Sequence, residues 1–200
     1  MEKLLIGSNN INKIKEIETI FKLNNVTFDI VTPKEIGCFD EPTEDGNSFS
    51  ENAIIKTKFY YDLYHLPCIG EDSGICIDYF GGRPGIYSKR FLSDLNDKDK
   101  NDYILKLMDG IKNRKASFHD VLCYINSKGE IRTFDGINYG EISIEQIGDE
   151  GFGYDPIFLI PEYNKTEAKL GTDYKNKYSH RAIALKKFID FYKNENIKDH

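Results

Sequence analysis

The beginning of the chain constrains the fold most, because a short apolar run passes directly into a helical pattern. Leu4–Ile6 has the composition of a buried strand and ends at Gly7. The three polar residues that follow, Ser8, Asn9 and Asn10, are of the types that cap helices. Apolar residues then return with the helical period, at Ile11, Ile14, Ile17, Ile20 and Phe21. The chain is therefore predicted to open with a strand, a tight polar turn and a helix packed on a sheet.

A second strand and a second helix are expected next, separated by a loop. Residues 27–31 have a strand pattern, and residues 33–47 are rich in proline, glycine and acidic residues. Ser48 and Glu51 form a capping-box pair, so a helix is predicted from Ser48 to about Tyr64. Pro67 bars its continuation.

The rest of the chain adds strands and two more helices. Strands are expected at 68–71 and 75–80 around an Asp72-Ser73-Gly74 turn, at 118–126 and 131–134 around Ser127-Lys128-Gly129, and at 141–146 and 157–160; helices are expected at 97–108 and around Leu185, Phe188, Ile189 and Tyr192. Strands and helices thus alternate before a β-meander, which predicts a mixed α/β sheet flanked by helices. No linker or repeat divides the chain, so residues 1–200 are expected to form one folding unit.

Composition excludes several classes of protein. The net charge of −6 disfavours general binding to nucleic acid, which depends on neutralising phosphates. No apolar run approaches the roughly 20 residues that a membrane span needs, and no secretory signal pattern is present. The four cysteines form no C-x-x-C pair and are expected to be reduced and mostly buried. A cytoplasmic protein without a membrane partner is the expectation.

The first candidate site is the turn Ser8-Asn9-Asn10-Ile11-Asn12-Lys13. Backbone N–H groups at a helix start, together with the helix dipole, favour an anion such as phosphate. Lys13 in the first helical turn would add a full positive charge. The alternative is an ordinary helix cap beside a solvated lysine.

The second candidate is acidic. Glu41, Glu44 and Asp45 precede the second helix, and Glu71-Asp72 lies where a strand is expected to end. Carboxylates are the hard oxygen ligands that Mg²⁺ prefers. The alternative, favoured for Glu41 and Asp45, is that these are solvated loop carboxylates. A functional role is favoured for Asp72, because a buried strand edge rarely carries paired acids without a partner.

Two more candidates lie near the C-terminal end. In the stretch 148–156, glycines flank Phe152 and Tyr154, so the backbone can approach a flat ligand on which an aromatic ring stacks. The alternative is a hairpin loop plugged by aromatic side chains. Lys175 and Lys177 precede Ser179-His180-Arg181, where cations stand at the start of a helix and favour an anion or a base with exposed acceptors. The alternative there is an exposed basic helix start.

Taken together, these motifs resemble the inosine/xanthosine triphosphate pyrophosphatase family, which removes deaminated purine nucleotides. The resemblance extends from Leu4 to about Leu185. It rests on six stretches in order: Ser8-Asn9-Asn10 with Lys13 and Glu16; Glu44-Asp45-Gly46 with Phe49 and Glu51-Asn52-Ala53; Glu71-Asp72-Ser73-Gly74; Pro84-Gly85-Ile86-Tyr87-Ser88; Gly151 to Pro156; and Ser179-His180-Arg181. Glu71-Asp72 stands where the family commonly has Asp-Asp.

The resemblance implies a role for each matching position. Residues Ser8, Asn9, Asn10, Ile11, Asn12 and Lys13 would line the phosphates, with Lys56 as a second basic contact. Glu44, Glu71 and Asp72 would arrange Mg²⁺ and the attacking water, with Asp72 as general base and Ser73 touching the substrate. Phe152, Gly153, Tyr154 and Asp155 would hold the base, and Lys175, His180 and Arg181 would read its 6-oxo edge.

The resemblance also implies an architecture and a reaction. The fold would be the elongated, two-lobed α/β fold of these enzymes, which is related to the anticodon-binding-like and Maf folds, with the site between the lobes of a homodimer. Water would attack the α-phosphorus of ITP, dITP or XTP, releasing the monophosphate and pyrophosphate. Adenine would leave the donors for a 6-oxo group unpaired, which can reject the wrong base by roughly 10⁴-fold.

Three other functions remain open from the sequence. One is a Maf-like pyrophosphatase acting on pyrimidine or modified nucleotides, although the aromatic loop and Ser179-His180-Arg181 argue against it. Another is a nucleotide-binding regulator without catalysis. The third, a structural RNA-binding protein, is disfavoured by the acidic charge.

Overall fold

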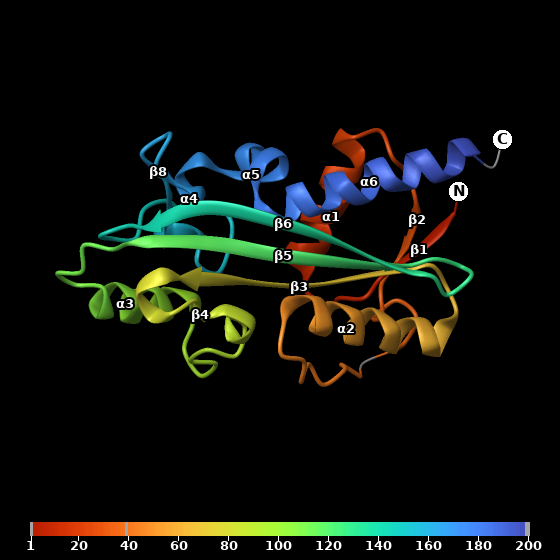
Figure 1. Cartoon of the computed structure of the whole chain (residues 1–200), viewed down its shortest axis with the longest axis horizontal. Coiled ribbons are helices and arrows are strands. Elements are labelled where there is room, and N and C mark those ends of the chain that lie inside the picture. The colour runs from red at the N-terminus through yellow and green to blue at the C-terminus, as the bar shows by residue number, and fades with distance from the viewer. Residues whose placement is uncertain (1, 39, 199–200) are drawn as a thin grey trace. The chain divides into compact units, whose positions relative to one another are not determined.

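The computed structural model describes residues 2–38 and 40–198, and these residues cluster into two compact units. Unit 1 comprises the chain up to Asp72, the segment Asp120–Gly136 and the chain from Arg181 onward. Unit 2 comprises Ser73–His119 and Ile137–His180. Met1, Phe39 and residues 199–200 lie outside the described residues. The prediction of one domain with two lobes therefore stays a prediction, while each unit can be described by itself (Figure 1).

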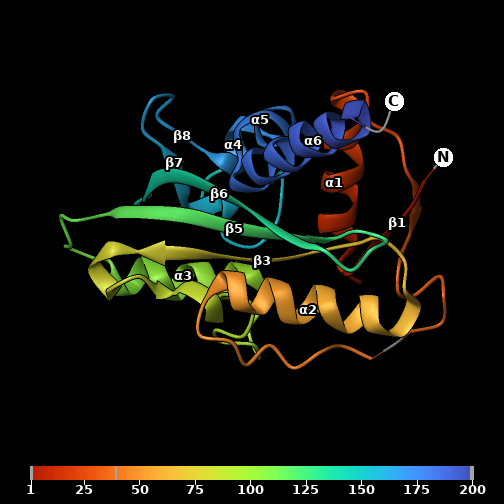
Figure 2. The ribbon, with the colours of Figure 1, turned by 45° about the vertical axis from the view of Figure 1, so that its right-hand side comes forward.

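Unit 1 contains a parallel core of strands with helices on both faces. Its elements are β1 (Lys3–Ile6), α1 (Ile11–Leu23), β2 (Asp29–Val31), α2 (Phe49–Tyr64), parts of β3 (Cys68–Ile77), β5 (Lys115–Ile125) and β6 (Ile131–Ile142), and α6 (His180–Lys198). Strand β1 pairs in parallel with both β2 and β3. Helix α2 covers one face of these strands, and α1 and α6 cover the other (Figure 2).

Local capping sets where the helices of unit 1 begin. Asn10 caps α1, because its Oδ1 accepts from the backbone N–H groups of Asn12 (3.0 Å) and Lys13 (3.3 Å). Ser48 caps α2 by accepting from Glu51 N at 3.1 Å. The Glu51 carboxylate in turn accepts from the backbone N–H of Asn47, one residue before the position that a capping box uses.

The core of unit 1 confirms the predicted apolar faces of the first and last helices. Its buried side chains include Leu4 and Ile6 from β1, Ile14, Ile17, Ile20 and Phe21 from α1, and Leu185, Phe188 and Ile189 from α6. Burying each such side chain contributes about 1.5–3 kcal/mol. This packing fixes α1 and α6 on the same face of the strands.

Unit 2 contains the remaining parts of β3, β5 and β6. It contains the 3₁₀ segments η1 (Asp78–Phe80), η2 (Gly85–Tyr87) and η3 (Asp155–Ile157), strands β4 (Arg83–Pro84), β7 (Phe158–Ile160) and β8 (Lys165–Thr166), and helices α3 (Asp97–Leu107), α4 (Glu167–Leu170) and α5 (Thr172–Tyr178). Helix α3 lies on one face of the strands, and α4 and α5 lie on the other. In the described part of the chain the strands form an eight-stranded sheet in the order β2-β1-β3-β5-β6-β7-β8, with β4 beside β3. The predicted mixed α/β sheet flanked by helices is confirmed.

One predicted turn is wrong, and the error matters for the site. Asp72-Ser73-Gly74 does not interrupt two strands but lies inside the continuous strand β3. A Cβ on Gly74 would lie 2.3 Å from the backbone oxygen of Gly85. Glycine is therefore required there for close packing between chain segments, not for a turn.

Other elements differ at their ends. Residues 78–80 form a 3₁₀ turn rather than the end of a strand, and the expected strand at 141–146 is only the end of the long strand β6. Among the described cysteines, Cys38, Cys68 and Cys123 are buried, Cys76 is half-buried, and all four are free thiols, as predicted. Within the described residues no helix is long and apolar enough to cross a membrane.

Candidate functional site

Two adjacent carboxylates on β3 point to opposite faces of the sheet. Successive side chains of a strand alternate between its faces, so Glu71 and Asp72 cannot share one. Glu71 reaches residues of α1 and α6, whereas Asp72 reaches α2. Both are buried, with 2% of Glu71 and 6% of Asp72 exposed. The pair thus belongs to two separate polar clusters of unit 1.

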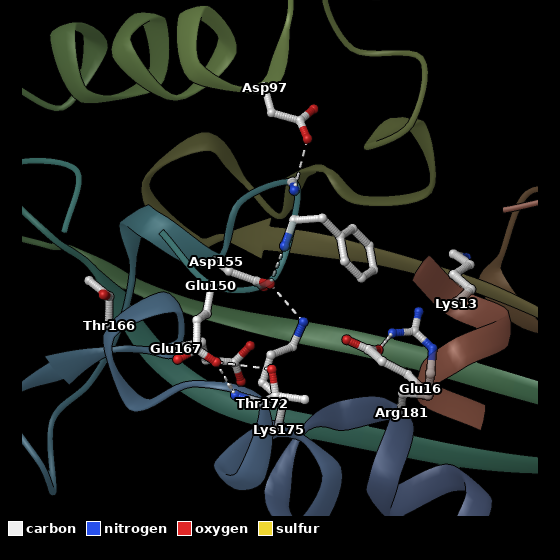
Figure 3. A network of polar contacts seen from close by, with 12 residues as sticks. Lys13, Glu16, Asp97, Glu150, Asp155, Thr166, Glu167, Thr172, Lys175 and Arg181 are labelled. Carbon is white, nitrogen blue, oxygen red and sulfur yellow. Dashed lines mark hydrogen bonds and ion pairs between the residues drawn. The ribbon is translucent and has the colours of Figure 1, made fainter. Parts of the chain in front are cut away.

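Glu71 is neutralised by two cations. Lys13 Nζ lies 3.0 Å from Glu71 Oε1, and Arg181 donates from Nε and Nη2 at 2.7–3.0 Å. Arg181, itself buried, also pairs with Glu16 of α1 (Figure 3). Burial would raise the pKa of Glu71, but Arg181 and Lys13 outweigh it and hold that pKa well below its usual range. Glu71 is therefore an ionised carboxylate whose oxygens are already bound.

Asp72 lies in a different environment. Asn52 Nδ2 donates to Asp72 Oδ2 at 3.0 Å, and Asn52 Oδ1 is fixed by the backbone N–H of Gly46 at 2.9 Å. Burial raises the pKa of Asp72 and the nearby Glu44 charge adds to the rise, against the lowering effects of the Asn52 hydrogen bond and Lys56. A carboxylate that is buried, oriented and more basic than usual has the properties of a general base.

Lys56 joins the Asp72 cluster from the next turn of α2. Its Nζ lies 2.5 Å from Glu44 Oε1 and donates to the backbone oxygen of Glu71 at 3.0 Å. Asn52 and Lys56 are four residues apart, so they lie on the same face of the helix. Glu41 and Asp45 are exposed.

The Asp72 cluster fits a magnesium ion better than Glu71 does. Within the described part of the chain no group of three or more His, Cys, Asp or Glu side chains is placed to hold a metal. Mg²⁺, however, keeps several waters and often binds one or two protein carboxylates. Glu44 raises the pKa of Asp72 although Glu44 is itself paired with Lys56, and Asp72 has a neutral amide rather than a cation as its hydrogen-bond partner, so a cation would relieve the repulsion between the two carboxylates. The Glu71 carboxylate already has its cations.

The turn after β1 carries the predicted phosphate contacts. Ser8 Oγ accepts from Asn10 N at 3.1 Å, and Asn10 Oδ1 accepts from the backbone N–H groups of Asn12 and Lys13. Asn9, Asn10, Ile11 and Asn12 are exposed. The cap therefore orders the turn, and an anion would compete with the Asn10 carboxamide for the same N–H groups. The role of this turn stays a prediction.

The aromatic loop of unit 2 is held from within by Asp155. This buried carboxylate accepts from Phe152 N at 2.8 Å and from Lys175 Nζ at 2.6 Å (Figure 3). Lys175 Nζ also lies 4.6 Å from the centre of the Phe152 ring, a cation–π contact. Tyr154 is buried and donates its hydroxyl to Ser88 O at 2.7 Å. Phe152 is only half-buried, so of the two aromatic rings it is the one accessible to a ligand.

The residues predicted to read a base fall into both units. Lys175 and His180 belong to unit 2, where His180 stacks on Phe118 with ring centres 4.7 Å apart. Arg181 belongs to unit 1 and binds Glu71 and Glu16. Ser73, the predicted substrate contact beside Asp72, is half-buried on β3.

Sequence reasoning missed several members of these clusters. Asn52 and Glu16 appear only as parts of matching stretches, although Glu16 stands three residues after Lys13 on one helix face. Asp120 of β5 was not singled out at all. It is 1% exposed, and neither of its carboxylate oxygens has a hydrogen-bond partner among the described residues. Burial and the charge of Glu71 raise its pKa well above the usual range.

A buried carboxylate beside a lysine in unit 1 and an accessible aromatic ring in unit 2 are features that a nucleotide-binding enzyme can use. The chain belongs to the Ham1 family, whose model matches residues 4–191. It is 39% identical over 196 residues to a dITP/XTP pyrophosphatase of Leptospira interrogans, covering 96% of this chain and 98% of that protein. It is also 39% identical over 190 residues to a dITP/XTP pyrophosphatase of Bacillus subtilis, covering 94% and 95%. The solved structure of the Staphylococcus aureus Ham1 protein matches with a TM-score of 0.86 and 32% identity, covering 97% of this chain and all of that one.

Proposed function

We propose that this protein hydrolyses non-canonical purine nucleoside triphosphates, namely ITP, dITP and XTP, to the monophosphate and pyrophosphate. Membership of the Ham1 family and the names of its relatives support the reaction class. The observation that carries the proposal is the environment of Asp72. Its pKa is raised by burial while Asn52 fixes one of its oxygens.

In the proposed reaction Asp72 accepts a proton from water as that water attacks the α-phosphorus. The P–O bond to the β-phosphate breaks, and pyrophosphate leaves with the electron pair. Lys13 and Lys56, both near the carboxylates of β3, would offset the charge that develops on the phosphates. The backbone turn at Ser8–Lys13 would orient the same phosphates.

Magnesium dependence is part of this proposal, with Asp72 and Glu44 as the carboxylates that would hold the ion. When bound, Mg²⁺ would neutralise phosphate charge and make a nearby water more acidic. Glu71 was expected to share this duty, but Lys13 and Arg181 already surround its carboxylate. We assign it instead to the arrangement of α1 and α6 around the site.

Base recognition is proposed to depend on unit 2. Stacking of a purine on Phe152 would contribute about 1–3 kcal/mol. Lys175 and His180 would supply donors toward the 6-oxo group, and Asp155 sets the position of the Lys175 ammonium. ATP presents an amino group at that position, so the same donors would lack a partner. For Arg181 to join them, it would have to exchange its contacts with Glu71 and Glu16.

The homodimer implied by the resemblance and the cytoplasmic location expected from the sequence composition also remain proposals. Sedimentation equilibrium tests the dimer, since a dimer of this 23.1 kDa chain doubles the measured mass. A purely monomeric protein at working concentrations would contradict it.

The function is tested by measuring pyrophosphate release from ITP, XTP, ATP, GTP and dTTP, each with Mg²⁺ and with a chelator. We expect release from ITP and XTP that stops when the metal is removed. Release mainly from dTTP would point to a Maf-like enzyme. No release from any nucleotide, with ITP still binding, would leave a nucleotide-binding protein without catalysis.

A further inference from the structure

Helix α3 contacts the aromatic loop through side chains that the proposed reaction does not use. Asp97 Oδ2 accepts from the backbone N–H of Gly153 at 2.9 Å, and Asn101 Nδ2 donates to the backbone oxygen of Gly153 at 3.0 Å. Asp97 and Asn101 are four residues apart and so share one face of the helix. Both polar backbone groups of Gly153 are thus bound by one helix.

A second anchor lies a few residues upstream of the loop. Gln146 Nε2 donates to the backbone oxygen of Lys98 at 3.0 Å and to Asp102 Oδ1 at 2.7 Å. Gln146 Oε1 also accepts from Asn101 Nδ2 at 3.3 Å. The first two turns of α3 therefore contact the chain both before and within the aromatic loop.

The contacts from Asp97 and Asn101, called the α3 clamp below, act on a glycine whose backbone conformation is unusual. Its φ of +62° lies in the left-handed region, where glycine is favoured. A Cβ on Gly153 would meet nothing within 4 Å, so the conformation, not lack of space, calls for glycine. A loop with this much backbone freedom needs external hydrogen bonds to hold one geometry.

Two carboxylates bind the backbone on either side of the Phe152 side chain, Asp97 of the α3 clamp after it and Asp155 before it. The peptide between Phe152 and Gly153 carries the N–H that Asp97 binds, while the N–H of Phe152 is bound by Asp155. Figure 3 shows Asp97 and Asp155 reaching successive N–H groups of the loop, with Lys175 bound to Asp155. The two carboxylates therefore fix the peptides on both sides of the Phe152 ring.

We propose that Asp97 and Asn101 are positioning residues that hold Phe152 as a preformed stacking surface for the purine of the substrate. This rests on the proposed function of the loop in binding the base. Neither side chain needs to touch the nucleotide. Because the clamp acts only on the base end, its loss should weaken binding of nucleotides and leave binding of pyrophosphate unchanged.

The kinetic test compares three variants. Asp97→Ala removes the acceptor for Gly153 N, and Asp97→Asn keeps an oxygen that can accept. Asp99→Ala removes an equal charge from the same helix, where the carboxylate accepts from Asn96 Nδ2 at the helix start. We expect Asp97→Ala to raise the KM for ITP about 3- to 10-fold, the equivalent of one hydrogen bond, with little change in kcat. Inhibition by pyrophosphate, which has no base, should be unchanged.

The conservative variant Asp97→Asn distinguishes a positioning role of Asp97 from general damage to the fold. Asp97→Asn should return the KM for ITP toward the wild-type value, and Asp99→Ala should match the wild type. A wild-type KM in Asp97→Ala would overturn the proposal. So would a parallel loss of pyrophosphate inhibition, because that would show damage beyond the base end.

A second measurement does not depend on activity. The chain has no tryptophan, so Phe152→Trp places a single indole in the loop, which can be excited selectively at wavelengths that the tyrosines do not absorb. In that background Asp97→Ala should lower the fluorescence anisotropy of the indole and increase its quenching by acrylamide, while Asp99→Ala should change neither. Unchanged anisotropy and quenching in Asp97→Ala would refute the clamp. If the wild type hydrolyses no nucleotide yet the indole responds as expected, the clamp stands and the proposed function fails.

Discussion

The two faces of β3 treat neighbouring carboxylates in opposite ways. On the face toward α1 and α6, Glu71 is bound by Lys13 and Arg181, and its pKa is held well below the usual range. On the face toward α2, Asp72 has an amide for a partner, and burial raises its pKa. Two consecutive residues of β3 thus differ in charge environment: Glu71 is neutralised by cations, and Asp72 remains basic.

The two environments suit different roles, a structural role for Glu71 and a chemical role for Asp72. A carboxylate enclosed by cations binds neither a proton nor a metal readily, but it ties helices together through its ion pairs. A carboxylate held by a neutral donor keeps its affinity for both. The alternation of a strand lets two successive acids serve these two purposes.

Glu71→Gln should have the largest effect on stability. It leaves the buried Arg181 guanidinium with Glu16 as its remaining carboxylate partner, and breaking such a pair costs about 3–5 kcal/mol. Thermal unfolding should show the midpoint falling by roughly 10 °C. The exposed Lys58–Asp62 pair supplies the control, since Asp62→Asn should leave the midpoint unchanged. Equal midpoints for Glu71→Gln and the wild type would mean that the Glu71 face does not hold the unit together.

Lys13→Ala tests the proposed role of Lys13 in binding the phosphates. Loss of one charged donor should weaken binding of ITP, ATP and pyrophosphate alike, by about 10- to 100-fold. Isothermal titration with each ligand measures this. Lys15, exposed on the same helix, provides the control variant Lys15→Ala, which should bind as the wild type does. A loss confined to one base would contradict a role in phosphate binding.

Asp120→Asn should have the smallest effect, and that effect should depend on pH. The pKa of Asp120 is raised in the folded protein, so between about pH 4 and that raised value the unfolded chain releases a proton that the folded protein retains. Stability of the wild type should therefore fall with rising pH relative to Asp120→Asn. Denaturant titrations at pH 4 and pH 8 measure the difference, with the exposed Asp190→Asn as control. A difference independent of pH would show that Asp120 keeps its ordinary pKa.

Local chemistry explains what could be predicted from the sequence. The cap at Asn10, the cap at Ser48 and the stop before Pro67 are set by residues a few positions apart, and the helices begin and end accordingly. The continuous strand β3 was missed because Gly74 is read locally as a turn residue. Its reason for being glycine is the backbone of Gly85, which local patterns do not contain.

In the candidate site, too, some features can be predicted from the sequence and others cannot. Asp72 and Lys13 are identifiable from residue type and position, and Lys56 from the family resemblance. The contact between Arg181 and Glu71 joins residues 110 positions apart, and that between Asp97 and Gly153 joins residues 56 positions apart. No local pattern encodes these pairs, so the opposite environments of Glu71 and Asp72 appear only in the fold.

The most direct test of the account is Asp72→Asn, examined for both turnover and thermal unfolding. We predict that pyrophosphate release from ITP falls by about 10³-fold or more, since loss of a general base alone costs about 10²–10⁴-fold. We also predict that ITP still binds and that the unfolding midpoint does not fall, because the replaced group is a carboxylate for which burial is unfavourable. Near-normal turnover in Asp72→Asn would contradict the assignment of the base and, with it, the division of roles between the two faces of β3.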